Sequence, residues 1–347
     1  MTGRTPRFDE PMTRIAVDAM SGDRGAPVAV EAVVASLQSH PDLEIVLVGD
    51  AHALNQEIAR HRKADVGDRL TVRHASEVVG MCESPARSLR QKKDSSMRVS
   101  INLVQSGEAG ACVSAGNTGA LMATARFVLK TLAGIDRPAI VSPIPSRRGH
   151  TLMLDLGANA ESTPEQLFQF AVMGAVVAET VHGVESPRVG LLNIGAEEMK
   201  GNVQIQQAGR LIGDSELNYI GFVEGDDIYI GDVDVVVCDG FVGNVALKTS
   251  EGLGKLIAQF LREEFSRNAL TRTAAFFAMP VLRAFRRRVD PRQYNGATFI
   301  GLQGTVIKSH GDADAVAFAS AIDVARMEVE QQVPERIRTL LAHSLGE

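Results

Sequence analysis

The sequence of 347 residues contains no tryptophan, and aromatic residues make up only 5% of it. Its three cysteines, Cys82, Cys112 and Cys238, are widely spaced and form no C-x-x-C pair. This spacing argues against a disulfide framework, favours a reducing cytosol and predicts that each cysteine is a small buried side chain. No run of 18 consecutive apolar residues occurs, so we expect no membrane-spanning helix.

Several signatures of common enzyme classes are also missing. There is no G-x-G-x-x-G, which weakens a dinucleotide-binding interpretation, and no G-K-[ST] follows a glycine-rich loop. There is no H-E-x-x-H or other close His/Cys spacing, so we predict neither a metal site nor a cofactor. The nucleophile-elbow pattern G-x-S-x-G fails because Cys112 stands two positions before Ser114.

The overall charge and the N-terminal composition narrow the class further. The net charge of −6 argues against non-specific nucleic-acid binding. The 32 glycines favour a loop-rich α/β enzyme over a helical bundle. Residues 1–13 contain two arginines and two prolines without an apolar run, so we expect a disordered extension and neither a signal peptide nor an anchor.

Short apolar runs alternate with helical patterns along residues 14–347. Most of the runs are β-branched and continuous, as in strands that helices cover on both faces. We therefore predict a single α/β catalytic domain with three layers and a mostly parallel sheet. The expected strands are 14–19, 43–48, 70–74, 110–114, 139–144, 151–156, 189–194, 219–222 and 233–238.

Residues 253–292 interrupt this alternation and predict a helical arm. Apolar residues from Leu253 to Phe265 recur at helical spacing. Pro280 is expected to end or kink a second helix. The arm either packs in a dimer interface or places an apolar tip in a bilayer interface next to Arg283 and residues 286–288. We favour membrane contact for the tip, which comprises Phe276, Phe277, Met279, Val281, Leu282 and Phe285.

Polar and glycine-rich clusters directly follow the expected strands, where ligands bind in parallel sheets. Residues 114–119 (SAGNTG) precede a helical pattern, and their N–H groups suit a phosphate. For this loop alone, a tight turn with an Asn or Thr cap is the better interpretation. Lys200 can neutralise the charge of a phosphate, or it is simply a surface charge. Asn244 can donate a hydrogen bond to a developing oxyanion, or it caps a loop.

Two further clusters leave alternatives open. Arg90, Lys93 and Met97 are spaced as on one helical face, which suits an anion, an acidic partner or simply a solvated surface. His310 follows the expected end of a strand and is a candidate ligand or proton donor, whereas Asp312 suits a helix cap.

Seven motifs in order resemble one family closely, the phosphate acyltransferases of bacterial phospholipid synthesis (PlsX). They cover about residues 14–330 and therefore nearly the whole chain. One departure is Ser21, where the family usually has a second glycine. The motifs are IAVDAMSGD (15–23), KDSSM (93–97), SAGNTGALM (114–122), DLGAN (155–159), NIGAEEMKGN (193–202), DGFVGNVALK (239–248) and VIKSHG (306–311).

The resemblance implies a Rossmann-like α/β/α fold similar to phosphotransacetylases and isocitrate dehydrogenases. It also implies a cytoplasmic homodimer, peripherally associated with the membrane, that transfers an acyl group from acyl carrier protein to inorganic phosphate. The next enzyme is then a membrane glycerol-phosphate acyltransferase. Three alternatives are transfer from acyl-coenzyme A, an oxidoreductase of the isocitrate-dehydrogenase type, and a non-enzymatic scaffold for acyl carrier protein.

The resemblance and the loop positions together give the expected site. Lys200, Asn244 and His310 are the expected catalytic residues. We expect all of the loops to form one anion pocket along a single edge of the sheet. The expected phosphate- or substrate-binding residues are Ser114, Gly116, Asn117, Thr118, Gly119, Asp18, Lys93, Asn159 and Lys308.

Overall fold

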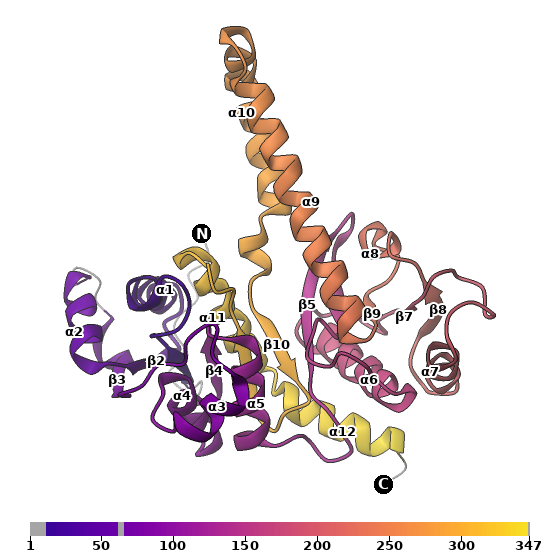
Figure 1. Ribbon diagram of the computed structural model, residues 1–347, viewed down its shortest axis with the longest axis horizontal. Coiled ribbons are helices and arrows are strands. Elements are labelled where there is room, and N and C mark those ends of the chain that lie inside the picture. The colour runs from indigo at the N-terminus through magenta and orange to yellow at the C-terminus, as the bar shows by residue number, and fades with distance from the viewer. Residues whose placement is uncertain (1–11, 62–65, 346–347) are drawn as a thin grey trace, which may run out of the picture. The chain divides into compact units, whose positions relative to one another are not determined.

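The computed structural model describes residues 12–61 and 66–345, without the side chains of 286–289, 291 and 343–345 (Figure 1). Its contacts divide the chain into two compact units. Unit 1 comprises Met1–Pro138 and Asn295–Ala342, and unit 2 comprises Ala139–Tyr294 and His343–Glu347. Most of the predicted N-terminal extension lies outside the described residues, but Thr13 already belongs to the first strand. The prediction of one catalytic domain stays a prediction.

The sheet of unit 1 has the strand order β3-β2-β1-β4-β11-β10. All neighbouring strands pair in parallel except β10, which is antiparallel to β11. The antiparallel strand β10 was not expected from the sequence. The strands are β1 (Thr13–Asp18), β2 (Leu43–Gly49), β3 (Leu70–His74), β4 (Ala111–Ser114), β10 (Ala297–Ile300) and β11 (Thr305–Lys308).

Helices cover both faces of this sheet. Ile15 and Val17 of β1 pack in a cluster with residues of α1 and α11, whereas Ala16 between them packs on the other face with Leu103 of α4. This alternation confirms the predicted three layers for unit 1. The helices are α1 (Gly25–Ser39), α2 (Ala51–Arg60), η1 (Gly67–Arg69), α3 (Pro85–Gln91), α4 (Ser96–Gln105), α5 (Thr118–Leu129), α11 (Ala315–Glu330) and α12 (Val333–Leu345).

The sheet of unit 2 has the strand order β5-β6-β9-β7-β8, parallel except for the pair β5 and β6. Helix α6 contacts β6 and β9, and α7 contacts β8. The strands are β5 (Ala139–Ser146), β6 (Gly149–Leu154), β7 (Val189–Leu192), β8 (Tyr219–Val223) and β9 (Val235–Val237). The helices are α6 (Pro164–Thr180), α7 (Val203–Gly213), α8 (Asp227–Ile230), α9 (Gly240–Ser266), α10 (Ala269–Val289) and η2 (Pro291–Tyr294).

The predicted helical arm is a pair of long helices, α9 and α10, which lie side by side (Figure 1). Asn268 caps α10, because its side chain accepts a hydrogen bond from the backbone N–H of Thr271. Pro280 was predicted to end or kink the helix. It does not end it, since α10 continues to Val289, and the kink stays a prediction. The neighbouring side chains are exposed, so water can solvate the backbone carbonyl that proline leaves without a partner.

Two other local expectations are wrong. Cys112 and Cys238 are buried as predicted, but Cys82 is exposed because it lies in the turn before α3. Arg90, Lys93 and Met97 do not share one helical face. Helix α3 ends at Gln91, Lys93 lies in the turn that follows, and Met97 is buried in α4.

Candidate functional site

In unit 1, a buried carboxylate stands at the end of β1 beside the end of β4. Asp18 and Ser114 are adjacent in the strand register, and the Ser114 hydroxyl donates a hydrogen bond of 2.6 Å to Asp18 Oδ2. The Ser21 hydroxyl donates to the same oxygen. Asp18 Oδ1 has no hydrogen-bond partner in the described part of the chain. Ser21, the departure from the family pattern, therefore stabilises the carboxylate instead of leaving the loop open.

The loop after β4 turns sharply into α5. The backbone N–H of Gly116 donates to the Ser114 hydroxyl at 3.1 Å. A Cβ at Gly116 would lie 2.5 Å from Met97 Cε and 3.0 Å from Ser21 Oγ, so the position favours glycine. Asn117 caps α5 by accepting from the N–H of Ala120 at 2.9 Å. Its amide group also donates to the carbonyl oxygen of Met81 at 2.6 Å and thereby holds residues 81–83 against the loop.

The start of α5 offers backbone donors to an anion. Leu121 donates the first backbone hydrogen bond of the helix to Asn117 O, so helix geometry leaves Thr118 and Gly119 without an acceptor inside the helix. Both residues are exposed. Two N–H groups without an acceptor inside the helix, together with the positive end of the helix dipole, can bind an oxygen of an anion such as phosphate.

The segment after β11 borders the same loop. The N–H of Ser309 donates to Ser114 O at 2.9 Å, and Lys308 Nζ lies 3.4 Å from Ala115 O. The buried amide of Asn295 donates to Ser309 Oγ at 2.8 Å and accepts from the N–H of His310 at 2.9 Å. The His310 side chain is half-exposed, with Nδ1 3.8 Å from Asp312 Oδ1. Strand β11 therefore brings Lys308 and His310 to the loop of residues 114–119.

In unit 2, a second buried carboxylate organises the loop after β6. Asp155 accepts hydrogen bonds from the N–H groups of Ile140, Gly157 and Ala158 through Oδ1. Its Oδ2 accepts from the N–H and the amide of Asn159 at 2.7 and 3.0 Å. Burial raises the pKa of Asp155, and these hydrogen bonds oppose that shift. Asn159 is buried and therefore shapes the loop.

Helix α9 begins against this loop. Asp239 caps it by accepting from the N–H of Val242 at 2.8 Å, and the N–H of Gly240 donates to Asn159 O at 2.8 Å. A Cβ added at Gly157 would lie 3.4 Å from Asn244 Cβ. Asn244 is exposed on the first turns of α9 and is therefore accessible to a ligand beside Gly157.

Lys200 stands in the loop between β7 and α7. The side chain of Asn193 donates to Lys200 O at 3.1 Å, and Gly201 at φ +84° packs on Asn193, so the backbone of this loop is fixed. Asn202 caps α7 through the N–H of Ile205. The Lys200 side chain is exposed, with Nζ 3.9 Å from a carboxylate oxygen of Glu197.

The predicted site residues are thus divided between the units. Unit 1 holds Asp18, Lys93, residues 114–119, Lys308 and His310, and all of these except Lys93 are joined by the contacts above. Unit 2 holds Asn159, Lys200 and Asn244. The prediction that all of them form one pocket stays a prediction.

Sequence reasoning missed two organising residues, Asp155 and Asn295. Asp155 had a signal, since it is an acidic residue at the end of an expected strand. Asn295 had none, because it lies outside the motifs and reaches Ser309 and His310 only through the antiparallel pair β10 and β11.

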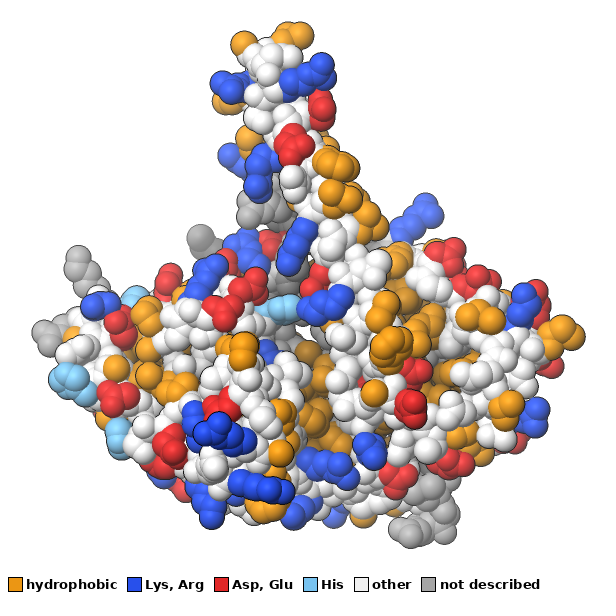
Figure 2. All heavy atoms as spheres, viewed as in Figure 1, with side chains coloured by type: hydrophobic (Ala, Val, Ile, Leu, Met, Phe, Trp, Pro, Cys, Tyr) orange, Lys and Arg blue, Asp and Glu red, His pale blue; other side chains and the backbone are white. Residues whose placement is uncertain are grey.

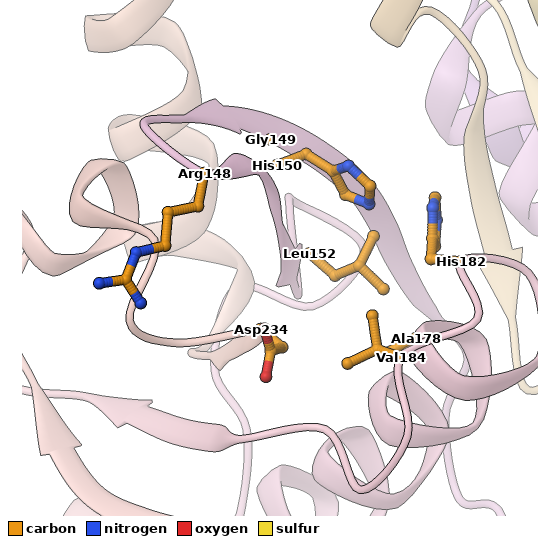
Figure 3. Close-up of a pocket in the computed structure, with 8 residues that line it drawn as sticks. All are labelled: Arg148, Gly149, His150, Leu152, Ala178, His182, Val184 and Asp234. Carbon is orange, nitrogen blue, oxygen red and sulfur yellow. The ribbon is translucent and has the colours of Figure 1, made fainter.

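A small cavity of about 140 Å³ lies elsewhere in unit 2 and contains none of the predicted residues (Figure 3). His150 and His182 line it with ring centroids 4.3 Å apart, near Arg148 and Asp234. Burial, followed by the neighbouring charge of His150, lowers the pKa of His182 to about 4. Burial also lowers the pKa of His150, against an opposing effect of Asp234. Both rings are therefore neutral at pH 7.

Within residues 12–61 and 66–345, no group of three or more His, Cys, Asp and Glu side chains is placed to hold a metal ion. In the same ranges, none of the helices combines the length and hydropathy needed to cross a bilayer.

The sequence comparisons decide the family. A sequence model of the family described as "Fatty acid synthesis protein" matches residues 13–336. The chain belongs to this family. The family resemblance drawn from the seven motifs is confirmed.

Two relatives illustrate how similar the family members are. The phosphate acyltransferase of Nitrosococcus oceani is 58% identical over 333 residues, which cover 96% of this chain and 98% of the relative. The phosphate acyltransferase of Methylococcus capsulatus is 59% identical over 326 residues, covering 94% of this chain and 96% of the relative. The predicted reaction agrees with the name that both relatives carry.

Solved structures resemble the fold at low sequence identity. A phosphotransacetylase from Streptococcus pyogenes has a TM-score of 0.63 at 16% identity, with 92% of this chain and 94% of that chain covered. The EutD phosphotransacetylase from Staphylococcus aureus has a TM-score of 0.60 at 14% identity, with 91% and 94% covered. The predicted α/β fold class is confirmed by these likenesses.

Proposed function

We propose that this protein transfers a fatty acyl group from the thioester of acyl carrier protein to inorganic phosphate, giving acyl phosphate for phospholipid synthesis. The observation that carries the proposal is the start of α5, where Thr118 and Gly119 are exposed and their N–H groups precede the first hydrogen bond of the helix, in the loop that follows Ser114. The high identity to phosphate acyltransferases supports phosphate as the anion.

In the proposed reaction, a phosphate oxygen attacks the thioester carbonyl carbon directly. The C–S bond then breaks, and the departing thiolate takes a proton to become the free thiol. One observation supports direct attack without a covalent enzyme intermediate. Burial raises the pKa of the Cys112 and Cys238 thiols, so neither of these two cysteines offers a thiolate.

We assign phosphate binding to the backbone of Thr118 and Gly119, in a loop shaped by Ser114, Gly116 and Asn117. Lys200 supplies positive charge, and the Asn244 amide donates to the developing oxyanion. His310 or Lys308 protonates the leaving thiolate. Lys93 remains a candidate for contact with the substrate. Asp18 and Asn159 position the loops.

The deciding experiment is phosphate-dependent release of free acyl carrier protein from its palmitoyl form. We expect release to stop when phosphate is omitted and acyl phosphate to appear in equal amount. Lys200→Ala and Asn244→Ala should each lower turnover by roughly 10². Near-normal turnover in both folded variants would remove these assignments. Faster transfer from acyl-coenzyme A would favour the phosphotransacetylase-like alternative, and carrier binding without turnover would favour the scaffold.

We also propose that the arm serves two contacts. Phe276 and Phe277, both about three-quarters exposed, belong to the apolar tip that enters the bilayer interface near anionic lipid. The exposed apolar stripe of α9 lies in the interface with a second copy in a homodimer. This stripe comprises Leu253, Leu256, Ile257, Phe260 and Leu261. Peripheral attachment would bring acyl phosphate to the next enzyme, a membrane glycerol-phosphate acyltransferase.

Vesicle flotation separates the two contacts. Phe276→Glu with Phe277→Glu should abolish flotation with vesicles containing anionic lipid and leave the dimer intact. Leu256→Glu with Phe260→Glu should dissociate the dimer, as measured by analytical ultracentrifugation. Unchanged flotation of the first variant would exclude the tip as the membrane contact.

A further inference from the structure

Helices α3, α4 and α5 of unit 1 contain four arginines and no acidic residue, although the chain as a whole has a net charge of −6. Both α3 and α4 pack on α5, so their cationic side chains are gathered on neighbouring helices. Figure 2 shows Lys and Arg side chains over the part of the surface where Figure 1 places these helices. We call this surface the basic face and define it by Arg90, Arg98, Arg126, Phe127 and Lys130.

The cations of the basic face are not neutralised by the protein itself. Among the described residues, no carboxylate lies within ion-pair distance of Arg90, Arg126 or Lys130. Nearby, Lys92 is different, since its Nζ is 2.8 Å from a carboxylate oxygen of Glu83. The basic face therefore keeps a positive potential that an external acidic group can meet.

An exposed aromatic ring lies beside two of these charges. Phe127 is 54% exposed, and the Arg98 guanidinium lies 5.2 Å from its ring centroid. Lys130 Nζ lies 5.0 Å from the same centroid. Such cation–π contacts hold the ring in place while its remaining surface stays free. An aromatic anchor surrounded by cations suits a partner surface with an apolar residue among carboxylates.

We propose that the basic face is the docking surface for the acyl carrier, a small acidic protein. This inference rests on the proposed function, since it names where that donor binds. Charge complementarity identifies the partner, and Phe127 supplies its apolar contact. A membrane is the weaker occupant, because Phe127 is the one large apolar residue among the five that define the face, whereas several apolar side chains are exposed at the tip of the arm.

The position of the basic face also suits delivery of the thioester. Phe127 lies on α5, and Thr118 begins the same helix at the phosphate loop. Phe127 follows Thr118 by nine positions, so the distance along the helix axis is roughly 14 Å. A carrier docked at the far end of α5 therefore holds its flexible prosthetic arm beside the loop that offers N–H groups to phosphate.

The test uses the full-length chain and palmitoyl acyl carrier protein at saturating phosphate. Arg126→Glu with Lys130→Glu should raise the KM for the acylated carrier at least about tenfold and change kcat less than about twofold. Phe127→Ala should raise KM in the same direction. The control is Arg210→Glu with Arg336→Glu, two exposed arginines outside the basic face that give the same change in net charge. This control should leave KM unchanged.

Salt provides an independent measurement. The wild-type KM should rise with ionic strength, and the rise should be much smaller in the Arg126→Glu, Lys130→Glu variant because its charges no longer attract the carrier. Equal KM values in this variant and the control would overturn the inference while leaving the proposed function intact. If the Arg126→Glu, Lys130→Glu variant no longer floats with vesicles but keeps the wild-type KM, the basic face binds lipid. That result would also overturn the inference. A wild-type protein inactive with the acylated carrier would overturn both.

Discussion

Gly243 in the first turn of α9 packs directly on Asp155, so closely that a Cβ at Gly243 would lie 1.9 Å from the Asp155 carbonyl oxygen. The nearest obstacle is backbone and cannot rotate away as a flexible side chain can. The contact fixes where α9 begins relative to the loop after β6, and with it the position of the next residue, Asn244. The family motifs at 155–159 and 239–248 are therefore in contact, and this contact requires glycine at position 243.

Gly243→Ala should destabilise unit 2, because α9 must move away from Asp155. We expect the free energy of unfolding to fall by roughly 1–3 kcal/mol. The matched control is Gly252→Ala in the same helix, where an added Cβ meets nothing within 4 Å. This control should stabilise the helix by up to about 1 kcal/mol. Urea denaturation measures both, and equal effects would contradict the packing argument.

Ser114→Ala should destabilise unit 1, because it removes a hydroxyl donor from a buried carboxylate. A hydrogen bond to a charged group contributes roughly 1.5–3 kcal/mol. Ser100 provides the control, since its buried hydroxyl donates only to the backbone oxygen of Ser96 at 2.8 Å. Ser100→Ala should cost roughly 0.5–1.5 kcal/mol. Chemical denaturation at pH 7 measures the loss in the free energy of unfolding for both variants. Equal losses would show that the hydrogen bond to the Asp18 carboxylate is no stronger than one to a backbone oxygen.

Glu328 should make the protein less stable as the pH rises. It is buried in α11, accepts a hydrogen bond from the Thr298 hydroxyl, and burial raises its pKa from 4.5 to about 7. The folded state therefore keeps a proton that the unfolded state loses between pH 4.5 and 7. This contribution is fully present below pH 4.5, and roughly 3 kcal/mol of it is lost by pH 7.

Glu328→Gln isolates this effect because glutamine resembles the protonated carboxyl group. The variant should gain stability relative to the wild type from pH 5 to pH 8, as followed by denaturant midpoints. A constant difference across this pH range would show that Glu328 titrates normally in the folded protein.

His182 should act in the opposite direction and make the protein less stable in acid. Its pKa falls from 6.5 to about 4 on folding, so the unfolded state binds the proton first as the pH drops. The stability is complete above pH 6.5 and is lost progressively down to pH 4, by roughly 3 kcal/mol. His182→Phe keeps a ring beside His150 and should lose less stability than the wild type between pH 7 and 4.5. NMR titration of the His182 ring checks the pKa directly, and a value near 6.5 would contradict the prediction.

Most of the strands could be predicted from the sequence because buried parallel strands produce short, continuous β-branched runs. Strand β3 was predicted with the same bounds, and β2 differed by one residue. Strand β10 was not predicted, and neither was its antiparallel pairing with β11. Periodicity reports the environment of each residue but not the direction of the strand beside it.

The candidate site was predictable to the level of its loops. Residues 114–119 do follow a strand and begin a helix, as the glycine and cap residues indicated. The hydrogen-bond partners of the individual polar side chains were not predictable. Asn117 combines the expected cap with a tether to Met81, and Asp155 accepts hydrogen bonds from an entire loop, because these contacts join segments that are distant in sequence.

The sequence by itself determined the family, the α/β class and the loops that carry chemistry, since motifs and strand patterns are local properties of the chain. Only the tertiary structure decided that Cys82 is exposed, that Asn295 supports the segment at His310, and that Arg98 and Lys130 both lie over the ring of Phe127. Each of these features depends on which distant segments pack together, and packing is set by the path of the whole chain.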